Sequence, residues 1–248
     1  MSSFTETGHA KNVANFEDLI SFCTGYGATY NPVNVNIKLP ALNTKYTACL
    51  SAVLAVKVAK TAFDNSTNSR ELVFAQLKKL STRIVNALEA TSAASVTVDD
   101  AKTVNRKIQG KRAGKVPEDP APGGDPAAEA TTKSISVSQQ SYDSMIDHFA
   151  KLIQIVSTEP LYLPNETDLK VVTLNTLLTS LKAANTSVIG TTTTYSNSRI
   201  TRDSALYDPG TGLVDIALEV KKYVKSLYGA SIPQYKQISG LKFAKLKK

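Results

Sequence analysis

An internal repeat constrains the fold of this chain more than any other feature of its sequence. When the sequence is shifted by 132 positions, residues 30–74 align with residues 162–206 without a gap, and 13 of the 45 aligned positions are identical. These positions are Tyr30, Pro32, Lys38, Leu42, Asn43, Thr44, Thr47, Ala52, Val56, Thr61, Asn65, Ser66 and Arg70. FEDLI at residue 16 also matches YDSMI at residue 142. We interpret the chain as two related sequence units.

A stretch of unusual composition separates the two units. Residues 116–130, VPEDPAPGGDPAAEA, hold four prolines, two glycines and four acidic residues. Proline and glycine at this density interrupt helices and strands, so the stretch is typical of a linker. We therefore predict helical unit 1 at residues 1–115, a linker at 116–133 and helical unit 2 at 134–248.

Apolar residues at spacings of three and four predict helices in unit 2. One face of SYDSMIDHFAKLIQIV collects Tyr142, Met145, Ile146, Phe149, Ile153 and Val156. A long helix is expected over 166–206, with Asn165 as its N-cap, because this range contains no proline. Threonines 191–194 alone would favour a strand, but they align with AKTA in an Ala-rich run of unit 1, so we predict helix there. A last amphipathic helix starts at residue 213 and ends at Gly229.

Unit 1 follows the same plan. We expect a short helix near residues 13–24, a long helix over 35–74 and a further helix over 75–89. Leu39 or Pro40 is the alternative start of the long helix, because proline is tolerated in a first turn. The predicted fold is all-α: two tandem, related units that form an elongated antiparallel helical bundle with pseudo-two-fold symmetry.

The residues that usually carry catalysis or bind metals are scarce. Cys23 and Cys49 lie among apolar residues and are interpreted as reduced core residues. His9 falls in an N-terminal segment that we expect to be mobile, and His148 is expected at the surface or boundary of a helix. GYG, PGGDP and DPGTG are interpreted as turns, and none precedes the Lys-Ser/Thr of a phosphate loop. We therefore predict no enzyme activity, no cofactor, no metal site and no small-molecule substrate.

One polar pattern is repeated near the end of each long helix. Asn65 and Arg70 in unit 1 correspond to Asn197 and Arg202 in unit 2. A polar layer that fixes the register of the helices is the favoured interpretation. The alternative is a pair of sites that contact a phosphate or a carboxylate.

Positive charge is concentrated in two segments. The net charge is +8, and residues 1–116 carry 15 Lys/Arg against 8 Asp/Glu. Segments 102–115 and 236–248 contain no acidic residue, and NRKIQGKRAGK aligns with YKQISGLKFAK at a shift of 130. Ile108 and Ile238 then correspond, and each is expected to make one anchoring apolar contact. The candidate contact residues are Lys102, Arg106, Lys107, Lys111, Arg112, Lys115, Lys236, Lys242, Lys245, Lys247 and Lys248.

Three roles remain open for these basic segments. Their charges can be solvated, can dock on acidic protein surfaces such as the linker, or can bind the phosphate backbone of nucleic acid. Only Tyr235 and Phe243 supply aromatic rings, which is few for a stacking platform on single strands.

The Tyr-x-Pro turn before a long Ala/Leu/Thr helix, the duplicated units and the closing K-x-I-x-G element resemble a group of uncharacterised, duplicated all-α proteins from bacteria. The resemblance covers residues 16–245 and implies the fold class alone. No signal-peptide pattern opens the chain, and no apolar run approaches the roughly 18 residues of a membrane span, so we expect a soluble, cytoplasmic protein without a membrane partner. The expected function is a structural or assembly protein that self-associates into a filament or array, and the alternative is a nucleic-acid-associated protein.

Overall fold

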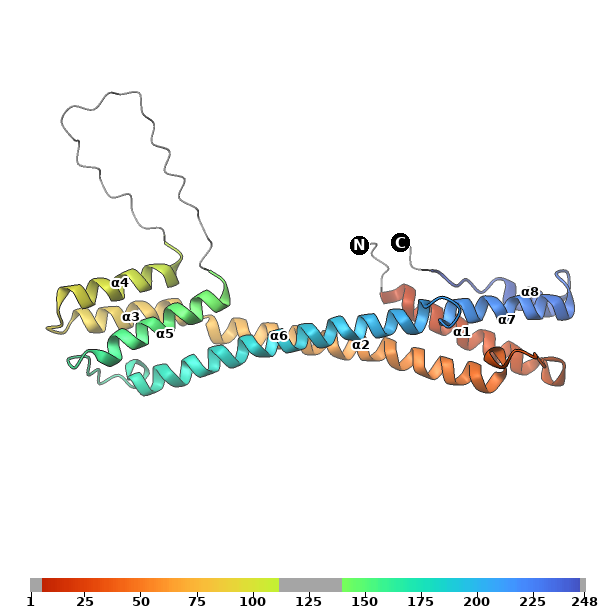
Figure 1. Cartoon of the computed structure of the whole chain (residues 1–248), viewed down its shortest axis with the longest axis horizontal. Helices are drawn as coiled ribbons and strands as arrows, with labels where there is room; N and C mark the ends of the chain where they lie inside the picture. Colours follow the sequence, from red (N-terminus) through yellow and green to blue (C-terminus); the bar gives the residue numbers. More distant parts are fainter. Residues whose placement is uncertain (1–5, 112–139, 246–248) are drawn as a thin grey trace, which may run out of the picture. The chain divides into compact units, whose positions relative to one another are not determined.

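The computed structural model describes residues 6–111 and 140–245, which form helices and no strand (Figure 1). The helices are α1 (Glu6–Gly25), α2 (Leu39–Phe74), α3 (Leu77–Glu89), α4 (Ser95–Gln109), α5 (Tyr142–Thr158), α6 (Val171–Tyr207), α7 (Leu213–Tyr228) and α8 (Pro233–Ser239). Single 3-10 turns lie at η1 (Gly27–Thr29), η2 (Val35–Ile37) and η3 (Thr167–Leu169). The predicted all-α class is confirmed. The predicted linker at 116–133 lies outside the described residues.

The chain forms two compact bodies, and each draws on both sequence units. Body 1 contains Met1–Asn65 and Gly190–Lys248, and body 2 contains Ser66–Ile189. Body 1 therefore joins α1 and the first part of α2 to the last part of α6, α7 and α8. Body 2 joins α3, α4, α5 and the remaining parts of the long helices. The division in space thus differs from the division of the sequence at residues 116–133.

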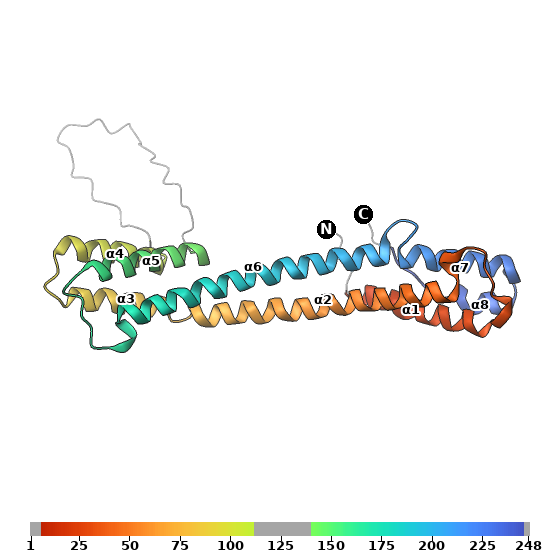
Figure 2. The same ribbon diagram turned by 60° about the horizontal axis from the view of Figure 1, so that its bottom comes forward.

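An apolar core holds body 1 together. Phe16 and Leu19 of α1, Leu42 of α2 and Val220 of α7 are fully buried in one cluster. In both views α7 and α8 lie beside α1 (Figures 1 and 2). The two long helices run antiparallel here, because the Cys49 thiol donates to the Ala205 carbonyl while Phe63 stacks on Tyr195.

A separate core holds body 2. Leu77, Ile84 and Leu88 of α3 face Phe149 and Leu152 of α5, and all five side chains are at most 1% exposed. Helices α3, α4 and α5 lie side by side in both views (Figures 1 and 2). The predicted apolar face of α5 is the face that enters this core.

A tyrosine closes the turn before each long helix. The Tyr30 hydroxyl donates to the Ile37 carbonyl at 2.6 Å, and the Tyr162 hydroxyl donates to the Leu169 carbonyl at 3.0 Å. Both rings are buried, and burial raises the pKa of Tyr162 to about 12. The two tyrosines, like the two acceptors, are 132 residues apart in the sequence. Each hydrogen bond fixes the chain just before α2 or α6 begins.

Several predicted helix boundaries need correction. Helix α1 begins at Glu6 rather than near residue 13, and α6 begins at Val171 rather than 166. Asn165 caps no helix, because the turn η3 stands between it and α6 and has Glu166 at its N-cap. The start of α2 at Leu39, helical structure across 191–194 and the end of α7 at Gly229 agree with the predictions.

The stretch Leu39–Glu89 is apolar enough, by length and composition alone, to cross a membrane. Its most apolar 18-residue window has a mean hydropathy of 1.3, and 22% of that window is buried. The lysines of α2 interrupt each apolar run, so we expected no span from the sequence. The mean hydropathy of an 18-residue window falls only a little when one or two lysines interrupt the apolar residues, so the window still counts as apolar.

Candidate functional site

The second basic segment packs against its own body. After α8, residues 241–245 have no regular secondary structure and lie along α1 and α7. Asn12 Nδ2 donates to the Ala244 carbonyl at 2.9 Å, and the Ala244 amide donates to Asn12 Oδ1 at 3.0 Å. Asn15 Nδ2 donates to the Lys242 carbonyl at 2.6 Å. Asparagine side chains of α1 therefore bind the backbone of this segment in the way that a neighbouring strand would.

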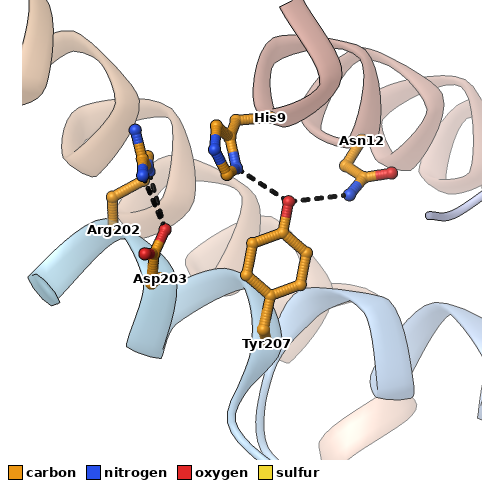
Figure 3. A network of polar contacts seen from close by, with 5 residues as sticks. All are labelled: His9, Asn12, Arg202, Asp203 and Tyr207. Carbon is orange, nitrogen blue, oxygen red and sulfur yellow. Dashed lines mark hydrogen bonds and ion pairs between the residues drawn. The ribbon is translucent and has the colours of Figure 1, made fainter. Parts of the chain in front are cut away.

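Asn12 also connects the segment to the end of α6. Its Nδ2 lies 3.3 Å from the Tyr207 hydroxyl, and that hydroxyl lies 2.7 Å from His9 Nδ1 (Figure 3). His9 and Asn12 are each only 1% exposed. The expectation of a mobile segment around His9 was wrong, because α1 extends to Glu6 and carries this histidine into a buried polar network.

Helix α7 holds the same segment by charge. Asp215 Oδ1 lies 2.6 Å from Lys245 Nζ, and Asp215 Oδ2 accepts the Gly210 amide at 3.0 Å. These two contacts, led by the hydrogen bond from Lys245, hold the pKa of the Asp215 carboxyl below its usual range. Lys221 donates to the carbonyls of Ser239 and Leu241, and its ammonium lies 5.5 Å from the centre of the Phe243 ring. Burial lowers the pKa of Lys221.

A cavity of about 640 Å³ opens beside the Lys245 ion pair. Its lining combines apolar and acidic side chains: Ile200, Asp203, Ser204, Tyr207, Asp208, Pro209, Val214, Asp215 and Lys245. Three carboxylates line this cavity, and Asp215 is the one that pairs with Lys245, whereas Asp203 pairs with Arg202. We call Asn12, Asn15, Asp215 and Lys221 the segment site, and this neighbouring hollow the acidic cavity.

The first basic segment begins on α4 in body 2. Lys102 Nζ lies 2.6 Å from Glu89 Oε1. The hydrogen bond between these two atoms is the main reason that the pKa of Lys102 is raised. Ile108 is fully buried, as is Ile238 of the second segment, so both anchoring contacts are confirmed. Gly110 ends α4 with φ +73°, and a Cβ there would lie 2.8 Å from the Gln140 side chain. Glycine is the residue that this turn requires.

The remaining candidate residues divide into two groups. Lys107, Lys111, Lys236 and Lys242 are exposed, and Arg106 is half-buried in the last turn of α4. Arg112, Lys115, Lys247 and Lys248 lie outside the described residues. Lys102 and Lys245 are the members of the set that form ion pairs within the described ranges 6–111 and 140–245.

The repeated Asn and Arg residues take different positions. Arg70 Nη1 donates to Asn185 Oδ1 at 3.1 Å, and its guanidinium lies 3.9 Å from the centre of the Tyr142 ring. Asn185 is 6% exposed and donates to Asp143 at 2.8 Å. Arg70 therefore joins α2, α5 and α6 within body 2.

In body 1, Arg202 is 2% exposed and bonds Asp203, its neighbour in the sequence, through Nε and Nη2 (Figure 3). Asn65 and Asn197 are exposed, so the arginines of the repeated pattern point inward and the asparagines face solvent. The buried asparagine that meets Arg70 is Asn185, which has no polar counterpart in unit 1.

The other reactive side chains are buried. His148 is 7% exposed and therefore buried, whereas we expected a position at the surface or boundary of the helix; α4 packs on α5 here. Burial lowers its pKa, and the charges of Lys107 and Lys151 act in the same direction. Burial raises the pKa of Cys23 to about 12 and that of Cys49 to about 11, so both stay protonated thiols at neutral pH.

Comparison of the chain with family models, with curated proteins and with solved structures finds no match in any of the three. The resemblance to duplicated bacterial proteins stays a prediction.

Proposed function

We propose that this chain is a non-enzymatic assembly protein that self-associates through an exposed face of its long helix α2. Leu50, Leu54 and Val58 are 36%, 49% and 70% exposed. They are four residues apart, so they form one row on the surface of α2 in body 1. We call these three residues the α2 row. It is the observation that carries the proposal.

The α2 row lies on a helix that is apolar on two sides. A second side of α2 buries Leu42, Cys49 and Val53 in the core of body 1. A helix with a second apolar face is typical of a helix that meets a partner on each side. Among the described residues of body 1, the face with Leu42, Cys49 and Val53 is the one that has its partner.

The threonine hydroxyls beside the α2 row already have hydrogen-bond acceptors within the helix, so they lose little when water is removed. The hydroxyls of Thr44, Thr47 and Thr61 each donate to the backbone carbonyl four residues earlier, at 3.0–3.1 Å. A hydroxyl that bonds its own helix in this way costs less to cover than a free one. The surface around the row is thus suited to contact with another helix of a second copy.

Several features of the chain occur twice. The two tyrosine turns, the starts of α2 and α6, and the anchors Ile108 and Ile238 correspond at shifts of 130 to 132 residues. We propose that the two tandem units arose by duplication and that pseudo-two-fold symmetry relates them. The α2 row itself is not repeated, because Lys182, Thr186 and Gly190 stand at the corresponding positions of α6. Contact through the α2 row is therefore a property of unit 1.

A matched pair of variants tests the α2 row. Val58 and Val96 are both 70% exposed, on α2 and α4 respectively. Val58→Glu should move the sedimentation profile toward the monomer across the concentration range, whereas Val96→Glu should leave the profile of the parent chain. Equal profiles for both variants and the parent would remove the α2 row from the proposal.

Exposed lysines favour nucleic-acid binding as a second candidate function. Lys236 and Lys242 on body 1 carry no ion-pair partner among residues 6–111 and 140–245. Such lysines bind phosphates by releasing counterions, so affinity falls steeply with salt. A gel-shift series with increasing salt, repeated with Lys236→Ala and Lys242→Ala combined, tests this role. Binding that ignores salt or the two substitutions would count against it.

A further inference from the structure

The way in which residues 241–245 are held suggests that the segment site recognises extended backbone. Three of its hydrogen bonds, from Asn12 and Asn15, involve main-chain groups of Ala244 and Lys242. Such contacts require an extended chain rather than a particular sequence. Lys221 adds further bonds to main-chain carbonyls from α7.

Charge supplies the selectivity that these backbone contacts lack. Lys245 is the residue of the segment whose side chain meets a carboxylate, at 2.6 Å from Asp215. Asp203 and Asp208 line the same acidic cavity. The site therefore favours an extended segment that carries a lysine at this position.

The segment joins the body through one residue that follows a short helix. Gly240 joins it to α8, whose Ile238 stays fully buried as an anchor. No helix has to unfold when residues 241–245 leave, because they have no regular secondary structure. The hydrogen bonds to the buried Asn12 side chain would break on leaving, and the same segment of a second copy would form them again.

We infer that the segment site of one chain binds residues 241–245 of a second copy, so that exchange of this segment links copies in the assembly. The inference rests on the proposed self-association and names a second contact for it. A chain's own segment competes for the site at a high effective concentration. The exchanged form therefore becomes more populated only as the protein concentration rises. A segment passed from copy to copy forms a contact that need not close on itself, which permits linear growth.

Complementary charge variants test the exchange. Asp215→Lys repels the chain's own Lys245, and Lys245→Glu repels the chain's own Asp215. When the two variants are mixed, each site meets a segment of opposite charge on the other chain. We expect the mixture to form hetero-oligomers, measured by light scattering and by pull-down of one tagged variant with the other.

The chain that carries both substitutions is the matched control. Its own segment and site are complementary again, so it should behave as the parent chain does and should not capture either single variant. This control also reports whether the substituted residues are compatible with folding. Association through the α2 row would be the same in all of these samples, so the two proposals fail separately. No gain in association on mixing, with the double variant folded, would overturn the inference.

A peptide measurement gives the affinity directly. A labelled peptide of residues 241–248 is titrated into the full-length Lys245→Glu variant, whose own segment is repelled by Asp215, and binding is followed by fluorescence anisotropy. We expect saturable binding to this variant and roughly tenfold weaker binding to the full-length Asp215→Lys variant, because an attractive pair becomes a repulsive one. Lys245→Glu in the peptide should restore the binding to that variant. A scrambled peptide that binds equally well would contradict a built site.

Discussion

Asn12 and Ala244 form a two-way amide pair, in which the asparagine side chain both donates to and accepts from the backbone of a residue 232 positions away. The pair ties α1 to the segment that follows α8. Because the Asn12 side chain is buried and also meets Tyr207, it cannot regain these bonds from water.

Replacement of Asn12 should destabilise body 1 more than replacement of its neighbour. Asn12→Ala leaves the half-buried Tyr207 hydroxyl and the Ala244 main chain without this buried partner, and we expect a loss of about 1–3 kcal/mol in the free energy of unfolding. Asn15 makes one exposed bond, so Asn15→Ala should cost at most about 1 kcal/mol. Urea unfolding measures both. Equal losses would show that the burial of Asn12 does not increase what its hydrogen bonds contribute to the free energy of unfolding.

The two tyrosine turns should respond alike. Tyr30→Phe and Tyr162→Phe each remove a hydroxyl that serves a backbone carbonyl in a buried turn, so each should cost about 1–2 kcal/mol. Tyr195→Phe is the control, because the ring that stacks on Phe63 is retained. Thermal unfolding of the three variants makes the comparison. A cost at only one of the two turns would argue against equivalent roles.

Arg70 should stabilise body 2 through its stacking as well as its charge. Arg70→Ala removes the bond to Asn185 and the contact with the Tyr142 ring, and we expect a loss of about 1–3 kcal/mol. Arg70→Lys should recover little, because an ammonium lacks the planar guanidinium. Lys57→Ala, at an exposed position on the same helix, is the control for loss of a cation. An Arg70→Ala variant as stable as this control would contradict the prediction.

Docking of residues 241–245 should weaken in acid. The Asp215 pKa is lowered in the folded chain, so the carboxylate contributes fully above its ordinary pKa of about 4 and loses that contribution as pH falls through the lowered value. Hydrogen exchange at the Ala244 amide reports the docking. Its protection should fall with pH in the parent chain more than in Asp215→Asn. The same pH dependence in both chains would assign it to another group.

Features that depend on local pattern could be predicted from the sequence. The apolar face of α5, the helix through residues 191–194 and the anchors Ile108 and Ile238 follow from spacing or from comparison of the two repeats. In each case the signal lies within one helix or within two aligned segments.

Features that depend on distant partners could not be predicted. The first turns of α1 are polar, so His9 and Asn12 look exposed until Tyr207 and Ala244 are placed against them. Asn185 gave no signal either, because the repeat pairs it with Val53 and its partner Arg70 is 115 residues away. Identity between the repeats predicts the same contact for Tyr30 and Tyr162, but Arg70 and Arg202 are also identical and bind different partners.

Light scattering of the full chain, from low micromolar to near-millimolar concentration, tests the central claim of self-association most directly. The account predicts a weight-average mass that rises continuously with concentration above that of the 26.6 kDa chain. A mass that stays at the value of one chain over the whole range would contradict it.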